Sequence, residues 1–136
     1  MNADTTPIAA DLERERLDAY SGRIIGSGHA VRTKLGCGFL EKVYENALSI
    51  ELQVRGLAVE QQRPVQVLYN GRVVGDYIPD LIVEDSIVVE VKAAIGLGKI
   101  HRQQCINYLR ATGYRVCLLL NFGTPRLQVE RLVWKF

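Results

Sequence analysis

Apolar side chains recur at three- and four-residue steps in three stretches of the chain, a spacing typical of helices packed on a core. We expect these helices over residues 9 to about 35, 39 to about 55, and about 98 to 112. The first contains three glycines, Gly22, Gly26 and Gly28. Each costs roughly 1 kcal/mol relative to alanine in a helix interior. They therefore either weaken this helix or let another element approach it closely.

Between the second and third of these helices, the pattern changes to that of strands. Segments 64–69 and 72–76 flank Asn70-Gly71, a dipeptide favoured in two-residue type I′ turns, and predict a β-hairpin. Strand-like residues continue to Val83 and, after a turn, over 87–92, which predicts a three-stranded antiparallel meander.

Two more strands are expected after the third helix. The apolar run 114–122 is typical of a strand buried on both faces, and 129–136 alternates like a half-exposed edge strand. The order ααβββαββ predicts an α/β sandwich with one mixed sheet. We expect residues 1–7 to be a flexible tail and 8–136 to form a single domain.

Composition and charge narrow the class of protein. The chain has 136 residues, 48% of them hydrophobic and 24% charged, which suits one globular domain. A net charge of +2 is too small for a domain that coats nucleic acid by charge alone, so any phosphate contact must be local. Neither a membrane span nor a signal pattern is visible, which predicts a soluble, cytoplasmic protein.

The three cysteines give no sign of a disulfide framework or a zinc site. Cys37, Cys105 and Cys117 are odd in number and lack CxxC spacing. Cys117 lies in an apolar run and is expected to be a small buried hydrophobe.

The second predicted hairpin brings acidic residues together. If its turn is centred on Asp85, Asp80 lies opposite Glu90 on one sheet face, with Lys92 two residues further along the same face. Opposed carboxylates repel each other, and a divalent cation such as Mg²⁺ would compensate. The alternative is a surface salt bridge between Glu90 and Lys92, because a shift of one residue would turn Asp80 to the other face.

Two further carboxylates lie on the second helix. Glu41 falls at the margin of the apolar stripe, on the side of Tyr44, where it could reach a site under the sheet. Alternatively, Glu41 only complements the positive end of the helix dipole. Glu51 also projects to the apolar face, and either competes with Glu41 for this role or belongs to a buried ion pair.

The third helix carries His101, Gln104 and Tyr108 on one face. These three side chains either line a polar site or form the solvent-exposed side of the helix. Nearby Lys99, Arg102 and Arg110 add local positive charge that could meet a phosphate backbone.

Together, these residues resemble the PD-(D/E)XK nuclease superfamily. The matching pieces, in chain order, are Glu41, Pro79-Asp80, Glu90-Val91-Lys92 and a QxxxY element from Gln104 to Tyr108. The chain more closely resembles the small bacterial GxxExxY family, whose motif matches 38–44. One departure is Arg32, where that family often has histidine.

The resemblance implies a restriction-endonuclease-like αβββαβ core, a central mixed sheet flanked by helices, with an extra N-terminal helix and a C-terminal edge strand. It also implies a metal-dependent nuclease acting on nucleic acid, with DNA as the expected substrate and Mg²⁺ or Mn²⁺ as cofactor. The implied metal ligands are Glu41, Asp80, Glu90 and the Val91 carbonyl.

Other site residues follow from the same resemblance. Asp80, Glu90 and Lys92 are the implied catalytic residues, with Lys92 orienting or activating the attacking water. Substrate contact or support of the site is expected of Gln104, Tyr108, His101 and Tyr44.

Two alternatives to an independent nuclease remain. The fold could serve as a catalytically silent binding or assembly module that acts with a partner protein. A small-molecule phosphohydrolase is a weaker alternative, because no nucleotide-binding loop is present. The small net charge also favours a homodimer or a partner protein in holding nucleic acid.

Overall fold

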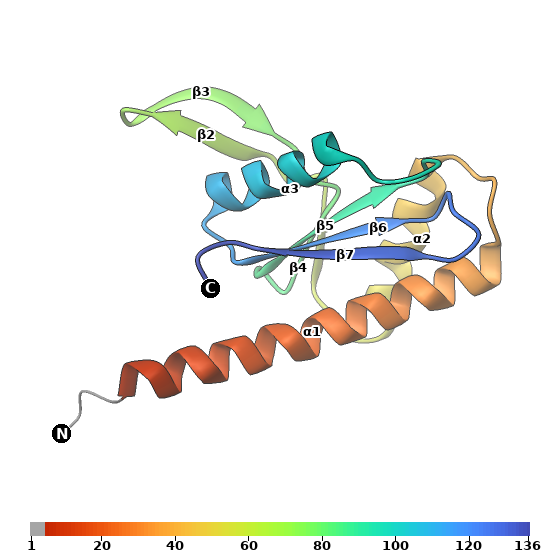
Figure 1. Cartoon of the computed structure of the whole chain (residues 1–136), viewed down its shortest axis with the longest axis horizontal. Coiled ribbons are helices and arrows are strands. Elements are labelled where there is room, and N and C mark those ends of the chain that lie inside the picture. Colours follow the sequence, from red (N-terminus) through yellow and green to blue (C-terminus); the bar gives the residue numbers. More distant parts are fainter. Residues whose placement is uncertain (1–4) are drawn as a thin grey trace.

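The computed structural model describes residues 5–136, with side chains from residue 8 onward. Its elements are α1 (Thr5–Leu35), α2 (Glu41–Val54), β1 (Val59–Gln61), β2 (Val65–Tyr69), β3 (Arg72–Tyr77), β4 (Leu81–Val83), β5 (Ile87–Lys92), α3 (Lys99–Thr112), β6 (Val116–Asn121) and β7 (Gln128–Val133). The five-stranded sheet has the order β1-β4-β5-β6-β7 (Figure 1). Among the described strands, only β5 and β6 pair in parallel, with α3 as the crossover between them, so the sheet is mixed as expected.

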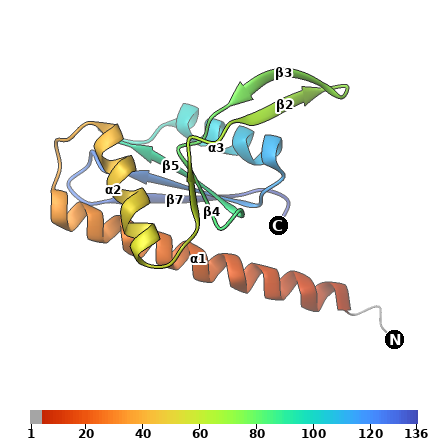
Figure 2. The same cartoon turned by 180° about the vertical axis from the view of Figure 1, so that it is seen from behind.

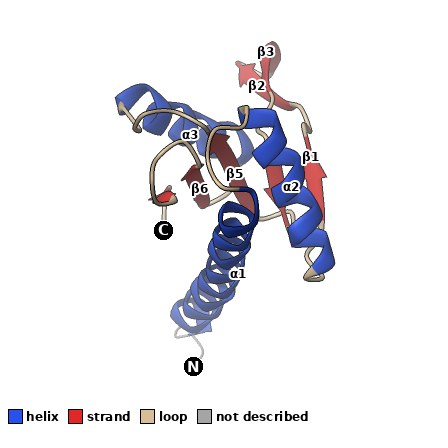
Figure 3. Ribbon diagram, turned by 90° about the vertical axis from the view of Figure 1, so that its right-hand side faces the viewer, coloured by secondary structure: helices blue, strands red, loops and turns tan. Residues whose placement is uncertain are grey.

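Helices cover both faces of this sheet (Figure 3). On one face, α1 and α2 pack against the larger core, which includes Tyr44, Leu48, Val89, Leu118 and Phe122. On the other face, α3 packs through Cys105, Tyr108 and Leu109 against Val88, Cys117 and Leu119. The prediction that Cys117 is a small buried hydrophobic residue is therefore confirmed. β6 is buried along its whole length, because both of its faces are covered.

The predicted three-stranded meander is wrong. β3 leaves the main sheet and pairs only with β2, while β1 takes the position beside β4. Pro79 lies between β3 and β4 and has no N–H to donate, so continuous pairing from Tyr77 to Leu81 is disfavoured. The Asn70-Gly71 hairpin itself is confirmed, with φ values of 50° and 75° at these residues, as a type I′ turn requires.

The first helix runs unbroken through its three glycines. Close approach explains one of them, since a Cβ on Gly28 would lie 3.1 Å from the Leu127 side chain and 3.3 Å from Leu120. α1 begins at Thr5, inside the segment expected to be a tail, and residues 1–4 of that segment lie outside the described residues. Along the described chain, no helix is long and apolar enough to cross a membrane.

Candidate active site

The β4–β5 hairpin has the predicted register. Leu81 pairs with Val89 and Val83 with Ile87, so the turn is centred on Asp85, which has a φ of 48°. Continuing this register by one step places Asp80 opposite Glu90. Glu90 and Lys92 lie on the face of β5 that α3 covers, because they share it with Val88 of the smaller core.

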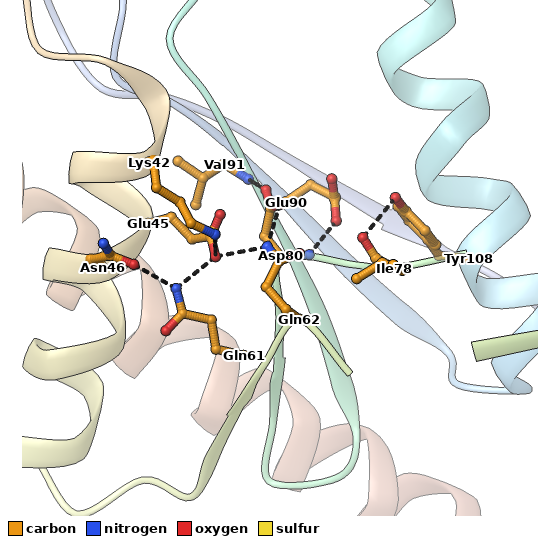
Figure 4. A network of polar contacts seen from close by, with 10 residues as sticks. All are labelled: Lys42, Glu45, Asn46, Gln61, Gln62, Ile78, Asp80, Glu90, Val91 and Tyr108. Carbon is orange, nitrogen blue, oxygen red and sulfur yellow. Dashed lines mark hydrogen bonds and ion pairs between the residues drawn. The ribbon is translucent and has the colours of Figure 1, made fainter. Parts of the chain in front are cut away.

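The carboxylates of Asp80 and Glu90 each accept a hydrogen bond from a main-chain N–H on the opposite side of the hairpin (Figure 4). The N–H of Asp80 donates to Oε1 of Glu90 over 2.8 Å, and the N–H of Val91 donates to Oδ2 of Asp80 over 2.8 Å. Each carboxylate thus uses one oxygen to hold the hairpin. The other Asp80 oxygen has only a long contact of 3.5 Å from Gln62, and within the described chain no donor bonds Oε2 of Glu90.

Both carboxylates resist ionisation. Burial, followed by the negative charge of Asp80, raises the pKa of Glu90 to about 9. Burial likewise raises the pKa of Asp80 to about 6. The charges of Glu45 and Glu41 act in the same direction on Asp80, whereas Lys92 opposes them. Without a cation the pair therefore tends to keep a proton, and a bound cation would stabilise its ionised form.

The Val91 carbonyl faces the strand that carries Asp80, and the residue opposite it is Pro79, which has no N–H. In an extended strand, the N–H and C=O of one residue point to the same neighbour. Since the Val91 N–H reaches Asp80, its carbonyl also faces the β4 side. The residue opposite Val91 in this register is Pro79, which cannot donate to that carbonyl. The proline leaves an oxygen without its usual ladder partner next to the carboxylates.

Lys92 begins a chain of polar contacts to α3. Its ammonium donates to Oε1 of Gln104 over 3.3 Å, and Nε2 of Gln104 donates to the Tyr108 hydroxyl over 3.1 Å. That hydroxyl donates in turn to the Ile78 carbonyl over 3.4 Å. Tyr108 is nearly buried, and burial is the main cause that raises its pKa, so the hydroxyl stays protonated. The predicted face of α3 therefore does line a polar site.

His101 contributes to this region from the start of α3. Its Nδ1 accepts the N–H of Gly98 over 3.1 Å, which satisfies a free donor at the helix N-terminus. His101 also lines a groove of about 570 Å³ together with Lys92, Gln104 and Tyr108. The structure thus brings four of the predicted residues around one hollow.

On the second helix, the buried carboxylate is Glu45 and not the expected Glu41. Glu41 is exposed in its first turn, whereas Glu45, one turn later, is 3% exposed. Oε2 of Glu45 accepts from Gln61 at 2.7 Å and from Gln62 at 2.9 Å, and Gln62 also contacts Asp80 (Figure 4). Burial alone would raise the pKa of Glu45, but these bonds and one from Lys42 outweigh it and lower the pKa.

The predicted set of three acidic ligands is not assembled. Within the described part of the chain, no three Asp, Glu, His or Cys side chains come close enough to hold one ion. The structure joins Asp80 and Glu90 but leaves Glu41 at the surface. The sequence signal for Glu45 was available, since it lies four residues after Glu41 and therefore on the same helix face.

Tyr44, expected to contact substrate or to support the site, lies in the larger core, where its contacts suit support. It is fully buried, stacks on Phe122 with ring centroids 4.7 Å apart, and donates its hydroxyl to the Gly36 carbonyl over 2.7 Å. Tyr44 therefore holds the loop between α1 and α2.

Glu51, the other carboxylate expected on the apolar face of this helix, forms a partly exposed ion pair with Arg55.

The β5 end that carries Lys92 is fixed by the loop after β6. The N–H of Phe122 donates to the Lys92 carbonyl over 2.8 Å, and Oδ1 of Asn121 accepts from Ala94 over 2.9 Å. A Cβ on Gly123 would lie 2.5 Å from the Ala94 backbone, so only glycine fits there without a shift. These three residues position the strand from which Lys92 projects.

Comparison with known proteins gives this geometry a context. The chain resembles a solved structure titled "Crystal structure of SSO0001", with a TM-score of 0.55, 22% sequence identity, and coverage of 70% of this chain and 50% of that one. At this identity the likeness concerns the fold alone, and the chain spans about half the length of that protein. A search of curated proteins found no match.

The sequence profile of the PD-(D/E)XK nuclease superfamily matches residues 18–132. That stretch includes helices from both sides of the sheet, and it includes Asp80, Glu90 and Lys92. The mixed sheet flanked by helices is the restriction-endonuclease-like fold that the sequence predicted. The chain belongs to the PD-(D/E)XK nuclease superfamily.

Proposed function

We propose that this protein is a metal-dependent nuclease that hydrolyses phosphodiester bonds, with DNA as its substrate. The observation that carries the proposal is the Asp80–Glu90 pair, in which Glu90 is buried and Asp80 half-buried. Among the described residues, one oxygen of each carboxylate has no close hydrogen bond, and the charge of Lys92 acts on both. A fold that needed only stability would not place two repelling carboxylates next to each other, away from water.

The donor set fits Mg²⁺ or Mn²⁺. These cations prefer oxygen ligands, and Mg²⁺ commonly takes one or two carboxylates together with water and substrate phosphates. Asp80, Glu90 and the Val91 carbonyl would hold the ion. Glu41 lies close enough for its charge to act on Asp80, and we assign it an outer role at the entrance of the site. When bound, the metal stabilises the charge that develops on the attacking and leaving oxygens.

The other residues act around this centre. Lys92 would hold the attacking water by a hydrogen bond and neutralise charge on the phosphate that is attacked. Gln104 and Tyr108 hold the Lys92 ammonium in place through the chain that ends on the Ile78 carbonyl. His101 would contact substrate from the wall of the groove. Glu45 positions Asp80 through Gln62.

Two finer assignments accompany this proposal. The motif at 38–44 supports membership of the GxxExxY family, and Tyr44 has a structural reason to be in it, because it anchors the loop that precedes α2. The net charge of +2 also supports a second subunit or a partner protein that supplies further phosphate contacts.

The direct test is cleavage of plasmid, single-stranded DNA and RNA by the purified protein with Mg²⁺ or Mn²⁺. We expect Asp80→Asn and Lys92→Met to abolish cleavage. Asn can still accept the Val91 N–H, so Asp80→Asn removes the charge while the hairpin is retained. Lys135→Met, an exposed lysine near the C-terminus, is the matched control and should cleave like the wild type.

The outcomes separate the alternatives. Cleavage that survives both site variants would have to come from a contaminant and would contradict the proposal. A wild-type protein that binds nucleic acid but cleaves none of these substrates would support the silent binding module.

A further inference from the structure

A groove continues from Lys92 along α3, beneath the β2–β3 hairpin. The hollow of about 570 Å³ at Lys92 is followed by another of about 530 Å³ between β2 and α3, and Tyr77 and Asn107 line both. The hairpin lies beside α3 and projects beyond the rest of the molecule (Figures 1 and 2). We call these two adjoining hollows together the hairpin groove. It leads from Lys92, next to the proposed metal site, to Arg110.

The lining of the hairpin groove matches nucleobases better than phosphates. Tyr77 is 40% exposed, Ile78 47% and Ile100 77%, so flat or apolar surface faces the hollow next to Lys92. The amides of Gln103 and Asn107 lie among them and can pair with base edges. Aromatic stacking faces combined with a few cations are the usual means of holding an unpaired strand.

The charges in the groove argue against a duplex. Binding to a duplex relies on many cations placed along two phosphate backbones. Here the side chains that can carry positive charge are Lys92 and His101 at one end and Arg110 at the other, and Asp76 adds a negative charge. Arg102 is engaged with Glu130 at 2.6 Å. This spacing suits one backbone that passes from one end to the other.

We propose that the hairpin groove binds an unpaired strand of nucleic acid, with Tyr77 as the platform on which a base stacks. The proposal rests on the proposed nuclease function and deepens it, because it gives the site a single-stranded or flapped substrate. The β2–β3 hairpin then acts as an arm that covers the strand. Tyr77 is held for this task by its edge-to-face contact with Tyr108, at a centroid distance of 5.6 Å.

The test is fluorescence anisotropy in EDTA, so that binding is measured without cleavage. The probes are a labelled single-stranded oligodeoxynucleotide and a blunt duplex of the same sequence. The wild type should bind the single strand about tenfold more tightly than the duplex. Tyr77→Ala should weaken single-strand binding about tenfold, within the range that one stacked base contributes, and Tyr77→Phe should restore it.

Tyr69→Ala is the matched control. Tyr69 belongs to the same hairpin and is 70% exposed, but it does not line the groove, so binding should not change. Ile100→Ala, at an exposed position on α3, tests the groove without disturbing Tyr108 and should also weaken binding. Equal affinity for duplex and single strand, or equal effects of Tyr77→Ala and Tyr69→Ala, would overturn the proposal.

Binding and cleavage can fail separately. If the wild type cleaves DNA but Tyr77 has no effect on binding, the groove proposal is wrong and the nuclease proposal stands. If it binds a single strand through Tyr77 but cleaves nothing with Mg²⁺, the groove stands and the nuclease proposal is wrong.

Discussion

At the scale of single residues, the proposed site gives Asp80 and Glu90 two tasks. One oxygen of each accepts a main-chain N–H at 2.8 Å and closes the end of the hairpin, and we assign the other oxygen to the proposed metal. Replacement by the corresponding amide keeps the first task and removes the charge that serves the second. Asn and Gln at these positions therefore separate folding from metal binding more cleanly than Ala would.

The sequence predicts Asp80, Glu90 and Lys92 because a strand has a strict period of two and a short turn fixes the register. It does not distinguish Glu41 from Glu45, since both lie on one face of α2. What separates them is β1, whose end carries Gln61 and Gln62 to Glu45. That contact depends on tertiary packing, which helical periodicity does not contain.

Tyr44 gives a prediction that separates support from substrate contact. Tyr44→Phe removes the 2.7 Å hydrogen bond to the Gly36 carbonyl but keeps the stacking on Phe122. We expect a loss of about 1 kcal/mol in the free energy of unfolding, measured with urea, because the half-buried Gly36 carbonyl loses its donor. Cleavage per folded molecule should stay unchanged. A large drop in cleavage at unchanged stability would show that Tyr44 contacts substrate after all.

At the scale of elements, local signals predicted the hairpins and helices but not their partners. The Asn70-Gly71 turn fixes β2 and β3 against each other, yet nothing in them requires pairing with the main sheet. Every residue of β3 is exposed, so its valines do not mark a core strand. β1 has only three residues, too few for a periodic pattern to show.

The loop after β6 yields a prediction about an element that fixes the site. Gly123→Ala would place a Cβ 2.5 Å from the Ala94 backbone and force the segment after Lys92 to move. Overpacking of this kind typically costs about 1–3 kcal/mol, measurable by urea unfolding, and cleavage should fall with it. Gly22→Ala is the control. Its Cβ would meet nothing within 4 Å on α1, and the helix should gain up to about 1 kcal/mol.

At the scale of the whole molecule, the net charge of +2 gives no sign of the acidic centre. That centre should lower the stability of the protein when no metal is bound. The folded pKa of Glu90, about 9, lies above its ordinary value of 4.5, so between these values the folded protein binds more protons than the unfolded chain. Its stability in EDTA should therefore fall as pH rises through that window. Thermal unfolding followed across pH, with and without Mg²⁺, measures this slope, which the metal should reduce.

Substitutions identify the source of the slope. Glu90→Gln should flatten the dependence and raise the melting temperature in EDTA at alkaline pH, as expected where function is favoured over stability. Asp11→Asn removes a charge from an exposed position on α1 and should leave the slope unchanged. A Glu90→Gln profile that follows the wild type would mean that Glu90 ionises normally.

The most direct measurement for the account is calorimetric titration of the protein with Mn²⁺. We predict a binding isotherm for the wild type and for Asp11→Asn, and none for Asp80→Asn or Glu90→Gln. Lys92→Met should still bind the ion while failing to cleave, because Lys92 is assigned to water and phosphate rather than to the metal. Equal Mn²⁺ binding by Asp80→Asn and the wild type would contradict the assignment of Asp80 and Glu90 as the metal site.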